Sequence, residues 1–322
     1  MEHKTIRIKG DFIEPVITVD NYVYDSLGSS VPKIVLVPNR DWKSYNTGFE
    51  DQKKNAVETM GCTGFNTHDS IQRIGKLRYG TDDNYSDRYL NIGAGTTRSG
   101  NSPHKVAEAI RQYLGCIPEE KLPFDETITS WAKYYSPKPL PQELMNIGTK
   151  WRNEHEFLHE WVFLPNQSLR EKQDRIWEAL KYSPVSTSVY GWRWNGQFYY
   201  KNTSDTDNHW TVIVNGVYGK YWEVDDTYEP YIKKLKWDYD FSYGKKYHYK
   251  KLLEESEKKN MDYTTLDKIY QKILCREPDE GASSYLNYDE PFVEEQLLKS
   301  KERQSIESLI GFFRKFGFLK GK

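Results

Sequence analysis

One cysteine and one histidine in this sequence have the surroundings that a thiol nucleophile and its base require. Cys62 follows Gly61 at the start of an apolar segment, and His209 comes directly before the strand-like run 210–214. The thiolate is the reactive form of cysteine, and the positive end of a helix and a nearby imidazolium both favour it. A histidine held by a rigid element can exchange a proton with such a thiol. These two residues therefore indicate nucleophilic catalysis at a carbonyl.

The segments around these residues must hold them in place. The pattern predicts a helix over 62–73, with Phe65 on its buried face. His68 lies six residues after Cys62 on this helix and would point away from it, so it is poorly placed to act on the thiol. The β-type residues after His209 predict a strand, which holds the imidazole more firmly than a loop would.

A third polar group is needed to orient the imidazole, and two aspartates compete for this role. Asp225 and Asp226 lie at the end of the strand predicted after His209. Successive strand residues point to opposite faces, so only one of the two can face the imidazole. We predict that Asp226 does so, with Asp225 as the alternative.

The overall composition excludes several classes of protein. Among 322 residues there are 46 Lys and Arg against 47 Asp and Glu, and the net charge of −1 gives no reason to expect binding to nucleic acid or anionic membrane. No apolar run has the length of a membrane span, and the N-terminus lacks the apolar core of a signal peptide. We therefore expect cytoplasmic synthesis without a signal peptide. Three cysteines, an odd and small number, argue against a disulfide-stapled secreted domain.

Composition and periodicity divide the chain into four parts. The composition changes at about residue 236, where Tyr and Lys begin to cluster. We predict an N-terminal β extension over 1–39, a main domain over 40–236, a charged Tyr- and Lys-rich linker over 237–262, and a helical module over 263–322.

Within the main domain the pattern predicts an α+β arrangement. Residues 75–103 are rich in Gly, Asn, Asp and Ser and are predicted to form a loop. The predicted helices are at 62–73, from 103 onward, and at 126–135, 141–152 and 168–182. The predicted strands are at 160–164 and 185–192, and a two-strand ribbon is predicted over 209–225.

His155 and His159 form an H-E-x-x-H sequence, which on a helix places two imidazoles and a glutamate around zinc. Here the motif continues into 160–165, whose pattern is typical of a strand, and no third ligand follows at a familiar spacing. We therefore expect no zinc at this motif, and the sequence predicts no metal site and no cofactor.

Several segments between about 40 and 235 occur in the order found in papain-like cysteine peptidases. The chain resembles the divergent bacterial and bacteriophage type of this family at 41–42, 50–52, 61–65, 106–124, 183–189, 208–209 and 224–228. The resemblance implies an α+β fold of two subdomains and a thiol hydrolase activity. It also implies a set of catalytic residues: Cys62 as nucleophile, His209 as general base, Asp226 as the orienting group, and Gln52 as an oxyanion donor. The residues expected to border the substrate are Gly61, Gly95 and Asn208.

Four features depart from the pattern of that family. Asp226 replaces the usual asparagine, although it too accepts the ring proton of histidine. Gln52 lies farther from Cys62 than is typical, and Thr63 replaces the aromatic residue that commonly follows the nucleophile. The N-terminal segment is shorter than the inhibitory pro-domain of the family, so zymogen control is not expected.

The sequence after residue 262 resembles a small helical domain of unknown function found in bacterial surface, secreted and phage-associated proteins. The similarity covers the run 270–285 and the later Val293 and Leu297. Its Arg-x-Pro-Asp-x-Gly segment, 276–281, is expected to end one helix and turn the chain before the next. Such a module is a candidate surface for a protein partner.

The predicted function is cleavage of a peptide or isopeptide bond by a Cys-His-Asp triad, in a phage or bacterial-surface context and with a virion-associated location. Two alternatives stay open. In one, the chain is a catalytically silent papain-like scaffold or virion structural component. In the other, it is a peptidoglycan amidase or transferase with the same thiol chemistry. The expected partner is therefore a polypeptide or peptidoglycan substrate, and neither nucleic acid nor membrane.

Overall fold

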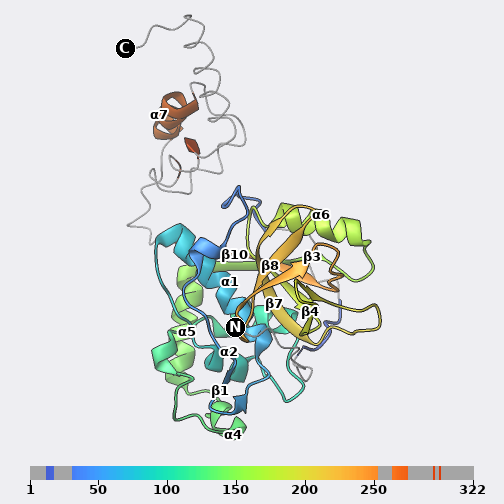
Figure 1. The fold of residues 1–322 in the computed structure, drawn as a ribbon. Helices are drawn as coiled ribbons and strands as arrows, with labels where there is room; N and C mark the ends of the chain where they lie inside the picture. The colour runs from blue at the N-terminus through green and yellow to red at the C-terminus, as the bar shows by residue number, and fades with distance from the viewer. Residues whose placement is uncertain (1–11, 18–30, 253–262, 275–292, 294–296, 299–322) are drawn as a thin grey trace, which may run out of the picture. The chain divides into compact units, whose positions relative to one another are not determined.

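The computed structural model describes residues 12–17, 31–252, 263–274, 293 and 297–298, and the chain divides into two compact units (Figure 1). The first unit spans Met1–Leu252 and the second Leu253–Lys322. The first unit contains all of the residues predicted to take part in catalysis.

An eight-stranded sheet forms one half of the first unit. Its strand order is β3-β10-β4-β7-β8-β9-β6-β5, and every neighbouring pair is antiparallel except β6 and β9. A separate two-stranded hairpin, β1-β2, precedes it in the chain. The strands are β1 (Lys53–Lys54), β2 (Val57–Glu58), β3 (His155–Phe163), β4 (Val185–Val189), β5 (Arg193–Trp194), β6 (Tyr199–Tyr200), β7 (His209–Val217), β8 (Tyr221–Asp225), β9 (Ile232–Lys236) and β10 (Gly244–Lys251).

Helices form the other half of this unit. Figure 1 shows α1, α2, α4 and α5 gathered beside the sheet, and α1 packs against β7, β10 and β4. A further helix, α6, packs against β3. The α-helices are α1 (Cys62–Tyr79), α2 (Asp87–Gly93), α3 (Pro103–Ala109), α4 (Trp131–Tyr134), α5 (Gln142–Glu154), α6 (Leu169–Ala179) and α7 (Tyr263–Leu274), with short turns of other helix types at Lys43–Tyr45, Ile110–Leu114 and Glu119–Lys121.

The α+β class predicted from the sequence is confirmed. The local signals explain the main helices: Pro103 stands in the first turn of α3, and Ser168 and Glu171 form a capping box at the start of α6. The left-handed Gly80 ends α1. The buried aromatic residues fill the core between the layers, and five tryptophans are fully buried: Trp42, Trp161, Trp192, Trp210 and Trp222.

The linker predicted over 237–262 is wrong for its first part, because β10 lies there, between β3 and β4 in the sheet. The lysines that suggested an exposed linker are buried in this strand. Lys246 pairs with Glu160 at 2.8 Å, and Lys245 lies 4.0 Å from the centroid of the Trp161 ring. A charged strand whose lysines have such partners cannot be distinguished from a linker by composition alone.

Two further predictions of local structure differ from the observed elements. The loop expected over 75–103 contains α2, whose first turn is capped by Ser86, the acceptor of a hydrogen bond from the Tyr89 amide at 3.1 Å. In the expected β extension, the described residues 12–17 and 31–39 contain no regular strand, and Phe12 alone forms a β-bridge, to Asn101.

The described part of the second unit is mainly α7. Its buried residues are Ile269, Tyr270, Ile273 and Leu274, spaced as expected for one face of a helix. The run 276–281 and most of the predicted helical module after residue 274 lie outside the described residues. None of the described helices combines the length and the hydropathy of a membrane span.

Candidate active site

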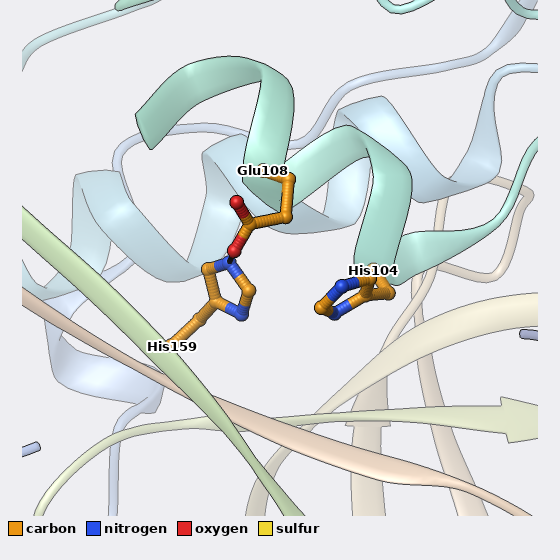
Figure 2. A group of neighbouring side chains, drawn as sticks. All are labelled: His104, Glu108 and His159. Carbon is orange, nitrogen blue, oxygen red and sulfur yellow. Dashed lines mark ion pairs between the residues drawn. The ribbon is translucent and has the colours of Figure 1, made fainter. Parts of the chain in front are cut away.

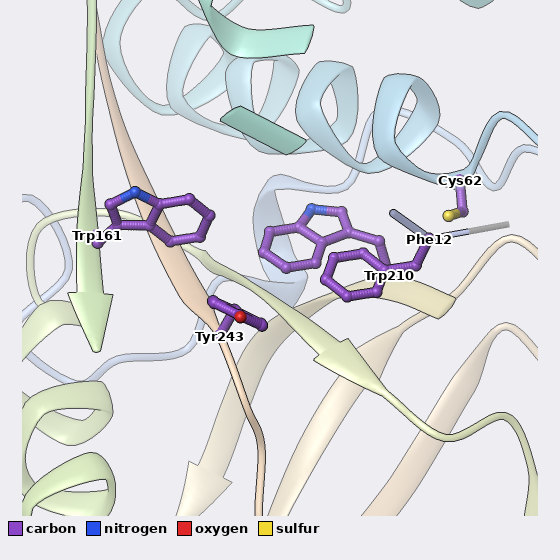
Figure 3. Close-up of a cluster of buried hydrophobic side chains, with 5 residues drawn as sticks. All are labelled: Phe12, Cys62, Trp161, Trp210 and Tyr243. Atoms are coloured by element: carbon purple, nitrogen blue, oxygen red, sulfur yellow. The ribbon is translucent and has the colours of Figure 1, made fainter. Parts of the chain in front are cut away.

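Cys62 is the first residue of α1, and its side chain is completely buried. Figure 3 shows it at the start of the helix, in a cluster with aromatic residues from four other segments. At this position the thiol lies at the positive end of an 18-residue helix, which favours the thiolate. The cluster consists of Phe12, Cys62, Trp161, Trp210 and Tyr243.

The turn into this helix is made by Met60 and Gly61. Met60 adopts a left-handed conformation with φ of 57°, which is unfavourable for a residue with a side chain. Gly61 has an ordinary negative φ, but a Cβ atom there would lie 2.3 Å from the Nδ2 of Asn91. The lack of a side chain at Gly61 thus lets Asn91 approach the start of α1 closely.

His209 is the first residue of β7 and is also completely buried. Its Nε2 atom lies 2.5 Å from Oδ1 of Asp226, directly after β8. The second carboxylate oxygen of Asp226 accepts a hydrogen bond from the Nζ of Lys233 at 2.6 Å. Both oxygens are thus engaged, one by the imidazole and one by a buried ammonium group.

Asp225 faces the other side of the strand, as the alternation predicts. Its carboxylate pairs with the guanidinium of Arg73, which also lies 2.9 Å from Asp69. Of the two candidates, the structure therefore brings Asp226 and not Asp225 to His209.

The electrostatic state of Asp226 depends on its two partners. Burial by itself opposes ionisation of this carboxyl, but the charges of Lys233 and His209 outweigh it, and the pKa of Asp226 is lowered from its ordinary value. Burial in turn lowers the pKa of Lys233, against the attraction of Asp226. Lys233 is thus the counter-ion of Asp226, and the buried pair that faces the imidazole has a net charge close to zero.

Hydrogen bonds fix the start of α1 and the start of β7 relative to each other, and aromatic rings surround His209. The Asn66 side chain donates both to the carbonyl of Cys62 at 2.8 Å and to the carbonyl of Trp210 at 2.6 Å. Because Trp210 follows His209 directly, this amide joins the start of α1 to the start of β7. The imidazole itself contacts the rings of Trp192 and Tyr228, with centroid distances of 5.9 and 5.4 Å.

Gln52 is buried beside the end of β8. Its Nε2 donates to Glu58 Oε1 at 2.9 Å and to the Tyr228 hydroxyl at 2.7 Å. Its Oε1 accepts a hydrogen bond from the hydroxyl of Thr227 at 2.7 Å. In this state both amide hydrogens of Gln52 are engaged, so donation to an oxyanion requires it to release one of these acceptors.

Two of the residues expected to border the substrate have clear local roles. Asn208 accepts a hydrogen bond from the Gly191 amide at 3.0 Å and so fixes the loop after β4. Gly95 has φ of 73° and lies in the tight turn after α2. This backbone conformation alone accounts for glycine at position 95, and no role in substrate binding is needed.

The N-terminal segment covers the thiol. The ring of Phe12 stacks on Trp210 with a centroid distance of 5.6 Å and an interplanar angle of 4° (Figure 3). The amide of Ile13 donates to the carbonyl of Asn101 at 3.0 Å, so an extended chain lies along this loop next to Cys62.

Phe12 and Lys233 also belong to this site, and neither was predicted from the sequence. Lys233 has a detectable signal, since the run Ile232–Lys236 alternates and places Lys233 on the same face as the buried Leu235. A lysine on the buried face of a strand calls for an acidic partner. Phe12 has no such signal, because its contacts are with residues far away in the sequence.

Comparisons with known proteins give similarity to solved structures only. No family model matches the sequence, and no curated protein matches it. The Amb a 11 cysteine protease of ragweed pollen, in its proform, has 16% identity and a TM-score of 0.42 over 67% of this chain and 66% of that chain. The bromelain protease of Ananas comosus has 14% identity and a TM-score of 0.46 over 66% of this chain and 98% of that one. The clostridial cysteine protease Cwp84 after propeptide cleavage has 14% identity and a TM-score of 0.49 over 66% and 57% of the two chains.

This chain thus spans slightly less than two thirds of the pollen protein and little more than half of the clostridial one. At such identities a similarity concerns the arrangement of helices and strands. The chemistry of this chain has to be drawn from its own side chains.

Proposed function

We propose that this chain is a papain-like thiol hydrolase that cleaves peptide or isopeptide bonds. The observation that carries the proposal is that His209 Nε2 lies 2.5 Å from Asp226. His209 begins β7, and the next residue, Trp210, packs in one cluster with Cys62. Nucleophile, base and orienting group then follow the order that thiol catalysis requires.

The His209–Asp226 contact assigns the two ring nitrogens. With Nε2 facing the carboxylate, proton exchange with the Cys62 thiol goes through Nδ1. His209 takes the thiol proton, and the thiolate adds to the carbonyl carbon while the C=O electron pair moves to oxygen. The C–N bond then breaks as His209 gives the proton to the leaving amine, which leaves a thioester. Water, deprotonated by His209, cleaves this thioester and restores the thiol.

The oxyanion of the tetrahedral intermediate is stabilised by backbone N–H groups at the start of α1, beginning with that of Cys62. Gln52 adds a further donor when its amide gives up the hydrogen bond to Glu58 and donates to the oxyanion instead. Its carbonyl end stays held by Thr227, which keeps the amide oriented during this exchange.

A polypeptide is the substrate class that the site favours. The segment at Phe12 and Ile13 shows that an extended chain fits beside Cys62 and hydrogen-bonds to Asn101. Because Phe12 occupies this place, it must move away before a substrate binds. The bacterial or phage context, a virion location and the role of the C-terminal module remain predictions from resemblance.

Cleavage of a denatured polypeptide mixture, followed by mass spectrometry of the new N-termini, tests this proposal. New N-termini are expected with the wild-type chain and not with Cys62→Ala, and Cys116→Ala should behave as the wild type. A catalytically silent scaffold would give no cleavage with any of the three. Release of material from isolated cell walls, without cleavage of polypeptides, would instead identify a peptidoglycan amidase.

A further inference from the structure

A second cluster of chemically active side chains lies away from the thiol. His104 and Glu108 are four residues apart on α3, so they share one face of that helix, and His159 approaches them from β3. One ligand atom from each of the three lies within 4.8 Å of the other two. Figure 2 shows the carboxylate and the two imidazoles turned toward a common space.

This cluster uses only one histidine of the H-E-x-x-H motif. The motif lies in β3 and not on a helix, so its two histidines are separated by about 13 Å. His155 is engaged elsewhere: its Nδ1 lies 2.7 Å from the carbonyl of Trp151, and its ring stacks on that tryptophan. The strand predicted at 160–164 corresponds to the end of β3, but the sequence gave no sign that His159 meets two residues of α3.

The burial and the hydrogen bonds of the cluster fit metal ligands. The His159 side chain is only 3% exposed, its Nε2 lies 2.9 Å from Glu108 Oε1, and its Nδ1 has no hydrogen-bond partner in the part of the chain that the structure describes. Both oxygens of Glu108 accept hydrogen bonds from Arg111, Oε1 at 3.1 Å and Oε2 at 2.7 Å, and Oε2 also accepts one from Gln112. Such outer contacts fix the orientation of a carboxylate that binds a metal.

We propose that His104, Glu108 and His159 bind one divalent transition-metal ion of the zinc class and so join α3 to β3. Two imidazoles and one carboxylate are a donor set that zinc accepts, with water in the fourth position. Ligand atoms around a tetrahedral zinc ion are about 3.4 Å apart. Closing the widest separation of 4.8 Å to that value needs a movement of about 1 Å, which rotation of the half-buried His104 and Glu108 side chains provides.

The charges around the cluster set its affinity. Lys245 is buried on β10 and lies over the ring of Trp161, the same ring that stacks on His104. Its ammonium group and Arg111 both oppose a further positive charge nearby, while the carboxylate of Glu108 attracts it. Replacement of Lys245 by methionine should therefore strengthen metal binding.

The bound ion would connect the helical half of the unit to its sheet. Trp161 contacts the cluster and also belongs to the group around Cys62, so the link reaches the neighbourhood of the thiol. The first expected effect is on stability, because a ligand that binds only the folded state raises its free energy of unfolding.

Zinc binding is best measured on the tag-free full chain in a Cys62→Ala background, which removes the other strong zinc ligand near an imidazole. We expect one zinc ion per chain after dialysis, by elemental analysis, and a visible absorption band when cobalt replaces zinc. A free zinc concentration 100-fold above Kd should raise Tm by about 5 °C or more. His104→Ala, Glu108→Gln and His159→Ala should each weaken binding by about 100-fold or more.

His155→Ala is the matched control, because it removes the other histidine of the same strand and should leave zinc affinity unchanged. Glu108→Gln keeps the shape of its side chain, so it tests the site even if a histidine variant fails to fold. The proposal is overturned if the Cys62→Ala chain binds no zinc, or if Glu108→Gln and His155→Ala bind it as tightly as their parent. Tighter binding by Lys245→Met in the same background would support the assignment further.

Discussion

The buried pair of Asp226 and Lys233 should be coupled in stability and in activity. Lys233 and Asp226 side chains are both 0% exposed, and the ammonium lies 2.6 Å from the carboxylate. Lys233→Met removes the counter-ion of Asp226 and leaves the carbonyls of Tyr228 and Pro230 without a donor that now lies 2.6 and 2.8 Å away. Removing one member of a buried ion pair costs about 3–5 kcal/mol of unfolding free energy.

The double variant separates the charge effect from simple loss of packing. Asp226→Asn alone leaves the Lys233 ammonium buried without its carboxylate and should also destabilise the fold. Asp226→Asn combined with Lys233→Met gives a neutral pair, in which the amide oxygen can still accept the proton of His209 Nε2. We expect the double variant to be more stable than the sum of the two losses predicts, by about 2–3 kcal/mol.

Urea unfolding followed by tryptophan fluorescence measures these free energies, and peptide hydrolysis measures the effect on kcat. Activity should fall strongly in both single variants and recover in large part in the double variant. Lys234→Met is the control, since Lys234 is half-exposed and 3.8 Å from Glu223, and it should change stability by less than about 0.5 kcal/mol. Losses that add within about 0.5 kcal/mol would refute the idea that Lys233 compensates the charge of Asp226.

Three further predictions follow from the structure. Phe12→Ala should speed chemical labelling of Cys62 by about tenfold or more. The loss of about 1.4 kcal/mol of packing on Trp210 raises by that factor the fraction of molecules in which the covering segment has moved away from the thiol; an unchanged rate would show that Phe12 does not limit access. Gln52→Ala should lower kcat by about 100-fold if its amide serves the oxyanion, whereas Tyr228→Phe, which removes a hydroxyl that accepts from Gln52 and donates to Glu58, should not; equal effects of the two variants would make Gln52 a structural residue. Burial raises the pKa of Glu119 to about 7, so its protonated form stabilises the fold fully below about pH 4.3 and this contribution is lost as the pH rises through 7. Urea titrations between these values should show the wild type losing stability relative to Glu119→Gln, and a difference that stays constant with pH would contradict this.

The sequence predicted the parts of the site that depend on short stretches of chain. The start of α1 at Cys62 and of β7 at His209 followed from periodicity and from β-type residues. Strand alternation limited the orienting group to one of Asp225 and Asp226, and the contact with Arg73 accounts for the other. These signals are local, so a single sequence contains them.

The parts that were missed depend on contacts between distant segments. Lys245 and Lys246 looked like linker residues because their partners, Trp161 and Glu160, are more than 80 positions earlier in the chain. The contact of His159 with His104 and Glu108 of α3 likewise joins segments that are far apart in the sequence. Composition cannot show that a charged side chain is buried with a partner, and the three-dimensional sheet order is needed to reveal it.

The central claim, that Cys62 is a thiol activated by His209, is tested most directly by labelling with a thiol-directed epoxide across pH. The chains to compare are wild type, His209→Ala and Cys116→Ala. Cys116 serves as the internal control, because burial raises the pKa of its thiol well above the ordinary value. We expect labelling at Cys62 that persists below pH 7, disappears in His209→Ala and is unchanged in Cys116→Ala. Labelling that follows an ordinary thiol titration, and that is the same with and without His209, would contradict it.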